Sequence, residues 1–242
     1  METKLERIAD KPKNEQRPIF TSLYHLINKE LLKQCHKELD GNKAVGIENV
    51  SKKEYAENLN ENIKDLVIRL KNKAYKPLPA LRVYIPKDNG KMRPLGISIY
   101  EDKIVQLALK KILEAIYEPK FLENKKYLKA GIMDKRQYIA TEEGSAQGNI
   151  ISPVLVNIYM HFVLVLWYKE IIEKRAEGEN FLVVYADDFI AGFQYQREAE
   201  AYYEALKNRM SKFGLELESS KSKIIKFGKY AEQSRKQLGE SI

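Results

Sequence analysis

The stretch FLVVYADDFIAGF at residues 181–193 decides the fold of this chain. Two short apolar runs rich in β-branched and aromatic residues, residues 181–185 and 189–193, flank the tripeptide Ala-Asp-Asp at 186–188. Runs of this length and composition predict two buried strands, and so short a connection predicts a hairpin between them. The stretch therefore predicts an antiparallel sheet with two carboxylates at its tip.

The paired aspartates indicate a cation site. Two neighbouring negative charges between apolar strands repel each other, and one of them retains a proton unless a cation is present. Mg²⁺ prefers carboxylate oxygens together with substrate phosphates, and two such ions stabilise the attacking and leaving oxygens of a nucleotidyl transfer. Asp187 and Asp188 are therefore candidate catalytic and metal residues, with Asp188 less directly engaged because successive strand residues face opposite ways. The alternative interpretation is an ordinary turn that contains aspartates.

The composition is that of a globular chain with a packed core. The chain has 242 residues, of which 44% are hydrophobic, with 12 Gly and 8 Pro. The longest apolar run near the single tryptophan, Phe162 to Tyr168, is short for a bilayer, and the polar first residues lack a signal-peptide core. The single cysteine, Cys35, has no internal disulfide partner, which is typical of a reducing compartment. We therefore expect a cytoplasmic protein with no membrane partner.

Positive charge is concentrated in the first part of the chain. The net charge is +8, and residues 1–140 carry +10 whereas residues 141–242 carry −2. Between residues 71 and 100, seven Lys and Arg side chains accompany the single acid Asp88, and tyrosines lie among them. This mixture is typical of surfaces that hold a phosphate backbone and stack on bases. The alternative is a solvated basic face without a polyanionic partner.

Periodicity and capping signals predict the remaining elements. Helices are expected over residues 21–39, 51–73, 102–117, 153–167 and 198–213, and further strands over residues 81–86, 93–97 and 223–227. Thr21 or Ser22 would cap the first helix, Ser51 and Glu54 form a capping-box pattern, and Gly214 would end the last helix. Residues 88–90 predict a hairpin turn, and residues 169–180 a charged loop.

Several motifs resemble those of one family. Residues 185–189, YADDF, resemble the active-site motif of reverse transcriptases, and residues 144–153, GSAQGNIISP, resemble the preceding motif G-T-P-Q-G-G-x-x-S-P. Residues 82–97 are similar to the fingers segment of group II intron-encoded reverse transcriptases, also called maturases. Residues 102–106 and 214–223 follow in the family's order, so the resemblance extends over residues 20–232.

The resemblance implies an α+β fold: reverse-transcriptase fingers and palm with an antiparallel palm sheet. Residues 1–74 would form an N-terminal helical extension and the start of the fingers, residues 75–125 the fingers, and residues 126–242 a partial palm. The implied activity is that of an RNA-directed DNA polymerase, with nucleotidyl transfer at two Mg²⁺ ions beside the YADD hairpin. The implied partners are an RNA template or intron RNA, a DNA primer and a dNTP, and the oligomeric state is left open.

The resemblance also assigns roles to single residues. Asp187 and Asp188 would hold Mg²⁺, and the residues expected to bind nucleotide are Lys87, Lys91, Arg93, Gln147, Gly148 and Lys221. An arginine offers a planar fork suited to phosphate, lysines add point charge, and a glycine allows close backbone approach to a ligand. Taken singly, each lysine is also consistent with a solvated surface charge.

The chain departs from the family in the palm. The family carries another metal-binding aspartate on a strand of the type D-I-x-x-F-F, where this chain has only residues 122–126, and Glu123 is the sole acid from residue 122 to 131. The sequence also ends at Ile242, before the family's next palm motif and thumb. Ala146 stands where the family usually has Pro, and Asn149 where it usually has Gly. We therefore expect an incomplete fold without one palm strand region and the thumb.

Three functional hypotheses follow. The first is a reverse transcriptase impaired by the missing aspartate, since misplacing the attacking oxygen alone costs about a hundredfold in rate. The second is a non-catalytic RNA-binding maturase remnant that uses the basic first part of the chain. The third is a decayed product that does not fold, which a cooperative thermal transition would contradict.

Overall fold

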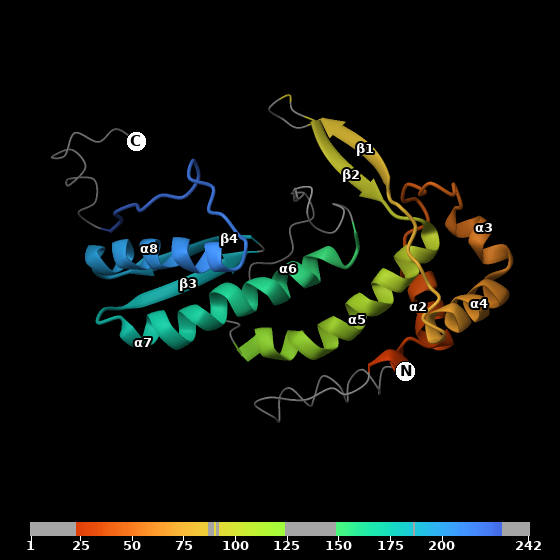
Figure 1. Cartoon of the computed structure of the whole chain (residues 1–242), viewed down its shortest axis with the longest axis horizontal. Helices are drawn as coiled ribbons and strands as arrows, with labels where there is room; N and C mark the ends of the chain where they lie inside the picture. The colour runs from red at the N-terminus through yellow and green to blue at the C-terminus, as the bar shows by residue number, and fades with distance from the viewer. Residues whose placement is uncertain (1–22, 87–89, 91, 124–148, 186, 229–242) are drawn as a thin grey trace. The chain divides into compact units, whose positions relative to one another are not determined.

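A computed structural model describes residues 23–86, 90, 92–123, 149–185 and 187–228 (Figure 1). The chain divides into two compact units, Met1–Ile158 and Tyr159–Ile242, and each is described by itself. Within the described residues, helices predominate and the strands form two separate two-stranded antiparallel sheets. This mixture agrees with the expected α+β class, while the division into extension, fingers and palm stays a prediction.

The first unit is mainly helical. Its elements are η1 (Tyr24–Leu26), α2 (Lys29–Glu38), α3 (Lys52–Glu57), α4 (Leu59–Lys71), β1 (Leu81–Pro86), β2 (Met92–Ile97), α5 (Tyr100–Glu123) and the start of α6 (Ser152–Met160). The second unit contains the end of α6, the π-helical segments η2 (His161–Val165) and η3 (Tyr168–Ile172), α7 (Glu173–Arg175), β3 (Asn180–Tyr185), β4 (Asp188–Phe193) and α8 (Gln196–Lys212).

The first predicted helix starts later than the periodicity indicates. Asn28 has an extended backbone, with φ −116° and ψ 176°, and its side chain accepts a hydrogen bond from the Leu31 amide at 3.0 Å. This is N-cap geometry, so α2 begins at Lys29 and a separate 3₁₀ turn precedes it. The prediction of one helix from residue 21 is therefore wrong, and the expected cap at residues 21–22 lies outside the described residues.

The capping-box prediction at Ser51 is confirmed. The Ser51 hydroxyl accepts from the Glu54 amide at 3.3 Å, and the Glu54 carboxylate accepts from the Ser51 amide at 2.7 Å. The predicted helix over residues 51–73 nevertheless divides into α3 and α4, because Asn58 between them has the non-helical angles φ −119° and ψ 34°.

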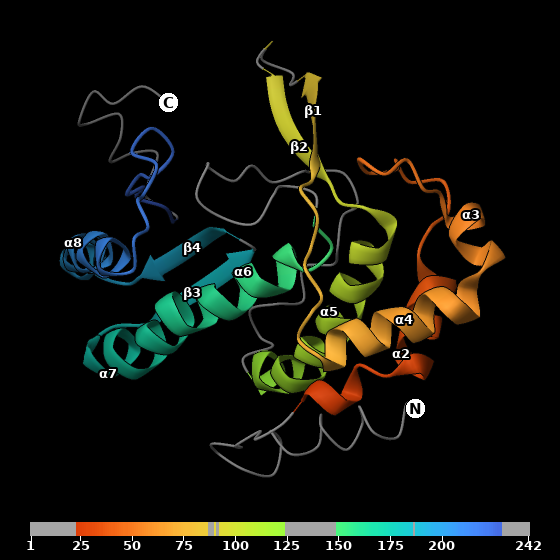
Figure 2. The same cartoon turned by 45° about the vertical axis from the view of Figure 1, so that its right-hand side comes forward.

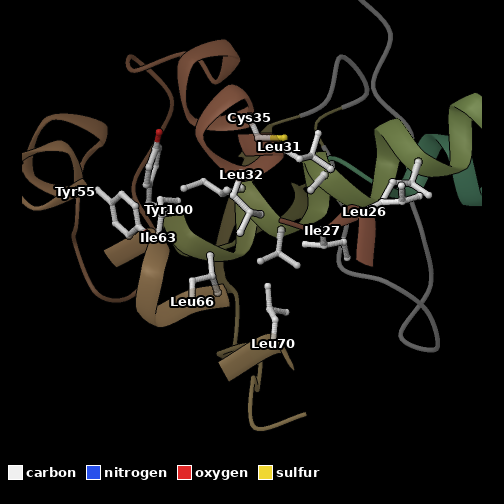
Figure 3. Close-up of a cluster of buried hydrophobic side chains, with 14 of the residues drawn as sticks. Leu26, Ile27, Leu31, Leu32, Cys35, Tyr55, Ile63, Leu66, Leu70 and Tyr100 are labelled. Carbon is white, nitrogen blue, oxygen red and sulfur yellow. The ribbon is translucent and has the colours of Figure 1, made fainter. Parts of the chain in front are cut away.

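Apolar faces of α2, α4 and α5 form the core of the first unit (Figure 3). Leu31, Leu32, Ile63, Leu66 and Ile104 are each 0% exposed. Burying a side chain of this size stabilises the fold by about 1.5–3 kcal/mol. Close packing of these three helices therefore stabilises this unit.

A buried histidine lies beside this core. His36 is 6% exposed, and its Nδ1 lies 2.9 Å from the Tyr100 hydroxyl. Burial, and to a smaller extent the Lys52 charge, lowers the pKa of His36. Its position beside the core is that of a structural histidine.

The first hairpin stands off the start of α5 (Figure 2). β1 and β2 pair antiparallel from Leu81 opposite Ile97 to Pro86 opposite Met92, as the sequence predicted to within one residue. Every residue of β1 is exposed. At the predicted turn, Gly90 has a φ of +75°, a conformation that favours glycine, while Asp88 and Asn89 lie outside the described residues.

Helix α5 is longer than predicted. It runs from Tyr100 to Glu123, whereas the apolar periodicity covered only residues 102–117. Its backbone remains helical through Pro119, although proline removes a helical hydrogen bond.

A long apolar helical stretch runs from α6 to α7. It extends continuously over Ser152–Arg175, so the predicted loop over residues 169–180 is wrong in its first part. By length and mean hydropathy this is the one helix of the described residues that could cross a membrane, which is weak evidence because core helices of soluble proteins pass the same test. Val163, Leu164 and Tyr168 are buried in the protein. The expectation of no membrane partner stays a prediction.

The end of α8 confirms the role predicted for Gly214. Its φ is +66°, and its amide donates to the Ser211 carbonyl at 3.1 Å, while the Leu215 amide donates to the Met210 carbonyl at 3.0 Å. These two bonds make a Schellman motif, which requires a left-handed residue at this position. The strand predicted over residues 223–227 is wrong: this segment is irregular, and no described strand pairs with it.

Candidate active site

The second hairpin has the predicted strands. β3 and β4 pair antiparallel from Asn180 opposite Phe193 to Tyr185 opposite Asp188. Leu182 and Val184 are 4% and 8% exposed, whereas the alternate residues of β3 face solvent. The prediction of two buried strands is therefore correct for one face of β3 only.

An aromatic cluster supports the buried face of this hairpin. The ring of Tyr202 on α8 lies 5.0 Å from that of Phe193, 5.7 Å from that of Tyr168 and 5.9 Å from that of Trp167, measured between centroids. Offset and edge contacts of this kind add to the stabilisation from burial. Sequence reasoning missed this cluster, although Tyr202, Leu206 and Met210 recur at the spacing of one buried helix face.

An arginine joins α8 to the long helical stretch. Arg209 donates from Nε to the Val163 carbonyl at 3.0 Å and from Nη2 to the Phe162 carbonyl at 3.3 Å. Its guanidinium carbon lies 4.4 Å from the centroid of the Phe213 ring. Both carbonyls belong to the π-helical segment η2, where the usual α-helical bonding is interrupted. Together with the aromatic cluster, Arg209 fixes the scaffold beneath the hairpin.

The two aspartates lie at the tip of the hairpin. Because Tyr185 pairs with Asp188, Asp187 lies in the connection and Asp188 is the first residue of β4. Strand β4 thus begins at Asp188, one residue before the predicted start at residue 189. Both residues are exposed, so a ligand in solvent can reach both carboxylates.

Opposing influences act on the carboxyl group of Asp187. Partial burial of the group raises the pKa of Asp187, its own backbone amide lowers it, the Asp188 charge raises it, and the Lys221 charge lowers it. The net shift is upward, and its largest cause is the partial burial of the carboxyl group. Lys221 lies in the turn after Glu218, where its amide donates to the Glu218 carbonyl at 3.0 Å. The structure therefore brings Asp187, Asp188 and Lys221 into electrostatic contact.

Two carboxylates at the hairpin tip form the donor set available to Mg²⁺. The described part of the chain contains no group of three or more His, Cys, Asp or Glu side chains able to hold a metal. Asp187 and Asp188 supply two carboxylates, and Mg²⁺ is typically bound by one or two carboxylates together with substrate phosphates. Burial is the largest cause of the raised pKa of Asp187, and the Asp188 charge is a smaller one that a divalent cation between the two carboxylates would offset. The pair fits an ion completed by a phosphate ligand.

Of the other candidate residues, the structure describes Arg93. Arg93 lies on β2 of the first unit, opposite Ile85, and is 8% exposed. Burial lowers the pKa of Arg93. Its side chain is therefore less accessible than a triphosphate-binding arginine on an open hairpin would be. Lys87, Lys91, Gln147 and Gly148 lie outside the described residues, so their roles stay predictions.

Comparison with known proteins gives the class. The family described as reverse transcriptase (RNA-dependent DNA polymerase) matches residues 119–241, about half of the chain. The match includes the YADD hairpin, α8 and the Lys221 turn. The chain belongs to the reverse transcriptase family.

Three relatives indicate the branch of this family to which the chain belongs. Group II intron-encoded protein LtrA of Lactococcus lactis subsp. cremoris is 30% identical over 232 residues, which cover 68% of this chain and 39% of the relative. Protein YkfC of Escherichia coli is 45% identical over 76 residues, covering 31% of this chain and 20% of the relative. An uncharacterized 91 kDa protein in the cob intron of Schizosaccharomyces pombe is 25% identical over 223 residues, covering 65% of this chain and 28% of the relative. Within its family, the chain is a member of the group II intron reverse transcriptase and maturase branch, and it spans about two fifths of LtrA.

Proposed function

We propose that this chain carries the catalytic carboxylates of an RNA-directed DNA polymerase and acts in nucleotidyl transfer at the tip of the β3–β4 hairpin. The observation that carries this proposal is the placement of Asp187 and Asp188 side by side at an exposed, rigidly supported tip near Lys221. An RNA template or intron RNA, a DNA primer and a dNTP are the partners that this chemistry needs.

Each residue of the tip has a distinct part in the proposal. Asp187 and Asp188 would hold Mg²⁺, which when bound supplies charge stabilisation to the attacking and leaving oxygens. Lys221 adds a positive charge that offsets the negative charge of the departing phosphate. The packed face of β3 keeps the tip from shifting, and rigid placement matters because misplaced reacting groups lose most of their rate.

Catalysis by this chain alone is proposed to be impaired. The alignment with LtrA extends over 232 residues yet uses 68% of the 242 residues of this chain, and the alignment with the cob intron protein, over 223 residues, uses 65%. Both relatives therefore have residues within the matched region that face a gap here. Such a gap agrees with the short segment at residues 122–126, where the resemblance leads us to expect another metal-binding aspartate.

Primer extension on an RNA template tests this proposal. We expect weak Mg²⁺-dependent extension that Asp187→Ala abolishes and that Glu179→Ala, an exposed acid preceding β3, leaves unchanged. Inserting the extra residues of LtrA after residue 121 should raise the rate by about a hundredfold or more. Robust extension by the unmodified chain would contradict the impairment, and equal extension by Asp187→Ala would contradict the assigned site.

A second candidate function is RNA binding without catalysis. The excess of +10 over residues 1–140, and the fully exposed strand β1 of the first hairpin, favour it. This function predicts RNA affinity that falls steeply with salt through counterion release and that does not change in Asp187→Ala. Absence of binding to structured RNA at low salt would exclude it.

A cytoplasmic location is also part of the proposal. Cys35 is fully buried in the core of the first unit, and burial raises the pKa of its thiol to about 12. A thiol so shielded is unreactive and suited to a reducing compartment.

A further inference from the structure

A tight turn at residues 218–222, here called the Glu218 turn, carries Lys221. The Glu218 carbonyl accepts from the Lys221 amide at 3.0 Å and from the Ser222 amide at 2.9 Å. The Glu218 side chain closes the same turn, because its Oε1 accepts from the Ser220 amide at 3.3 Å and from the Ser220 hydroxyl at 2.8 Å. Glu218 thus fixes the backbone on both sides of Lys221 through its own carbonyl and its carboxylate.

Helix α8 joins the Glu218 turn to the β3–β4 hairpin. The ring of Tyr202 lies 5.0 Å from that of Phe193 on β4, measured between centroids. The next residue, Tyr203, donates from its hydroxyl to the Ser222 carbonyl at 3.5 Å. Adjacent residues of one helix therefore contact both the hairpin and the turn, and all of these segments belong to the second unit (Figure 1).

The Lys221 charge acts on two carboxyl groups. Burial is the largest influence on the pKa of Asp187 and raises it, whereas the Lys221 charge acts in the opposite direction. Hydrogen bonds from Ser220, and to a smaller extent the Lys221 charge, lower the pKa of Glu218. Charges near a protein surface act strongly only over short distances, so the Lys221 ammonium lies near both carboxylates. Among the described residues, Lys221 is the cation that acts on Asp187.

Lys221 is exposed, so the place of its ammonium depends on how firmly its backbone is held. A lysine side chain carries about 2 kcal/mol of rotamer entropy, and an exposed one spreads over many positions. The hydrogen bonds of the Glu218 turn fix the backbone from which this side chain starts, and so limit the volume that the ammonium samples. A positive charge confined there offsets part of the negative charge of Asp187 and Asp188 and repels an approaching cation.

We propose that the Glu218 turn is a positioning element: it holds the Lys221 ammonium beside the paired aspartates as a counter-charge that competes with a divalent cation for the pair. The inference rests on the proposed function, which assigns Asp187 and Asp188 to a metal. In that function the same ammonium, once released from the aspartates, is free to pair with the phosphate that accompanies the cation. Glu218 and its partner Ser220 act through Lys221 and have no contact of their own with metal or substrate.

Binding of Mn²⁺ to the full chain, at low ionic strength and without nucleotide, tests this competition. Mn²⁺ takes the same carboxylate ligands as Mg²⁺, and electron paramagnetic resonance measures the free ion. We expect Lys221→Ala to bind Mn²⁺ about fivefold more tightly than the wild type, because it removes a unit charge near the pair. Ser220→Ala changes no charge and removes the hydroxyl bond to Glu218, so it should bind about twofold more tightly.

The matched control is Ser219→Ala, the same substitution one residue earlier. Ser219 is exposed and takes no part in the hydrogen bonds described for the Glu218 turn. The affinity of this variant for Mn²⁺ should equal that of the wild type.

A double substitution separates positioning from any other effect of the turn. In the Lys221→Ala background, Ser220→Ala should no longer change Mn²⁺ affinity, because the charge that the turn places is gone. Unchanged affinity in Lys221→Ala or in Ser220→Ala, or a tightening by Ser220→Ala that persists without Lys221, overturns the inference and leaves the proposed function in place. Absence of wild-type Mn²⁺ binding, or binding that Asp187→Ala does not weaken, overturns the metal site of the proposed function and this inference together.

Discussion

The two hairpins of this protein have the same size and are held in opposite ways. Each pairs two six-residue antiparallel strands. The β1–β2 hairpin exposes all of β1 and is held at its feet by Asp102 and Gln106, whereas the β3–β4 hairpin packs Leu182 and Val184 against helices. The comparison shows that a ribbon can be placed by a few polar contacts at its ends or by burial of one face. The first arrangement leaves strand β1 exposed to a ligand, and the second packs one face of the strand that leads to the tip.

The largest effect is expected from truncating the packed face of the second hairpin. Leu182→Ala removes a side chain that is 4% exposed, so it should cost about 2–5 kcal/mol of unfolding free energy through lost burial and a cavity. Urea unfolding followed by the fluorescence of Trp167, the single tryptophan, measures this in the second unit. Val183→Ala, on the exposed face, is the control and should cost less than about 1 kcal/mol. Equal losses for the two variants would mean that the face does not hold this hairpin.

A smaller loss of unfolding free energy is expected where the chain enters the first hairpin. Asp102→Ala leaves the Leu78 amide and the Tyr75 hydroxyl without their acceptor, which should cost about 1–3 kcal/mol. Circular dichroism during urea unfolding is the measurement. Asp65→Ala, which removes an exposed ion pair with Arg69, should cost less than about 1 kcal/mol. If Asp102→Ala is no more harmful than Asp65→Ala, polar contacts do not anchor the ribbon.

The third effect concerns a close approach across the second hairpin. Phe181 lies opposite Gly192, and a Cβ at Gly192 would overlap the Phe181 ring. The ring is 40% exposed and can swing aside, so Gly192→Ala should cost only about 1 kcal/mol. Trp167 fluorescence again reports the loss. Repeating the substitution in a Phe181→Ala background should remove this loss of unfolding free energy. A loss that persists there would mean that the added Cβ clashes with another group.

The smallest effect is expected from the pH dependence of the unfolding free energy that His36 causes. Because burial lowers the pKa of His36, the unfolded chain binds its proton more readily than the folded chain does. The stability from neutral His36 is complete above about pH 6.5 and is lost as the pH falls toward the lowered value. Urea unfolding at pH 7.5 and 5.5 should show this loss in the wild type and less of it in His36→Phe. His25→Gln, at an exposed position, is the control and should retain the wild-type dependence.

Local signals predicted much of the fold, and tertiary contacts decided the rest. The strand positions, the Ser51 capping box and the Gly214 helix end follow from short-range patterns that the structure reproduces. The division at Asn58 and the helix that continues to Arg175 depend on packing and on π-helical turns that no periodicity over a few residues reveals. The β-rich residues 223–227 form no strand, because no described strand offers them a partner.

Part of the candidate site could likewise be predicted from the sequence, and part of it could not. Asp187 and Asp188 can be proposed from the sequence because acids between two apolar runs are conspicuous, and Lys221 can be proposed because it stands in a motif. The burial of Arg93 could not be predicted, since a charged residue on an exposed ribbon is expected to face solvent. The bond between Ser98 and Asn149 joins residues 51 positions apart, and the sequence shows Asn149 only as a departure from the usual glycine.

Both ends of the first hairpin are hydrogen-bonded to α5, so a small rotation at these attachments produces a larger movement at the far end of the hairpin. Strands of six residues extend for about 20 Å, so a rotation of about 5° at Asp102 and Gln106 moves the tip by nearly 2 Å. This displacement is comparable to the length of a hydrogen bond, although Asp102 and Gln106 themselves barely move. Substitutions in the interior of α5, remote from any ligand, can therefore change the reach of the hairpin without altering a residue on it.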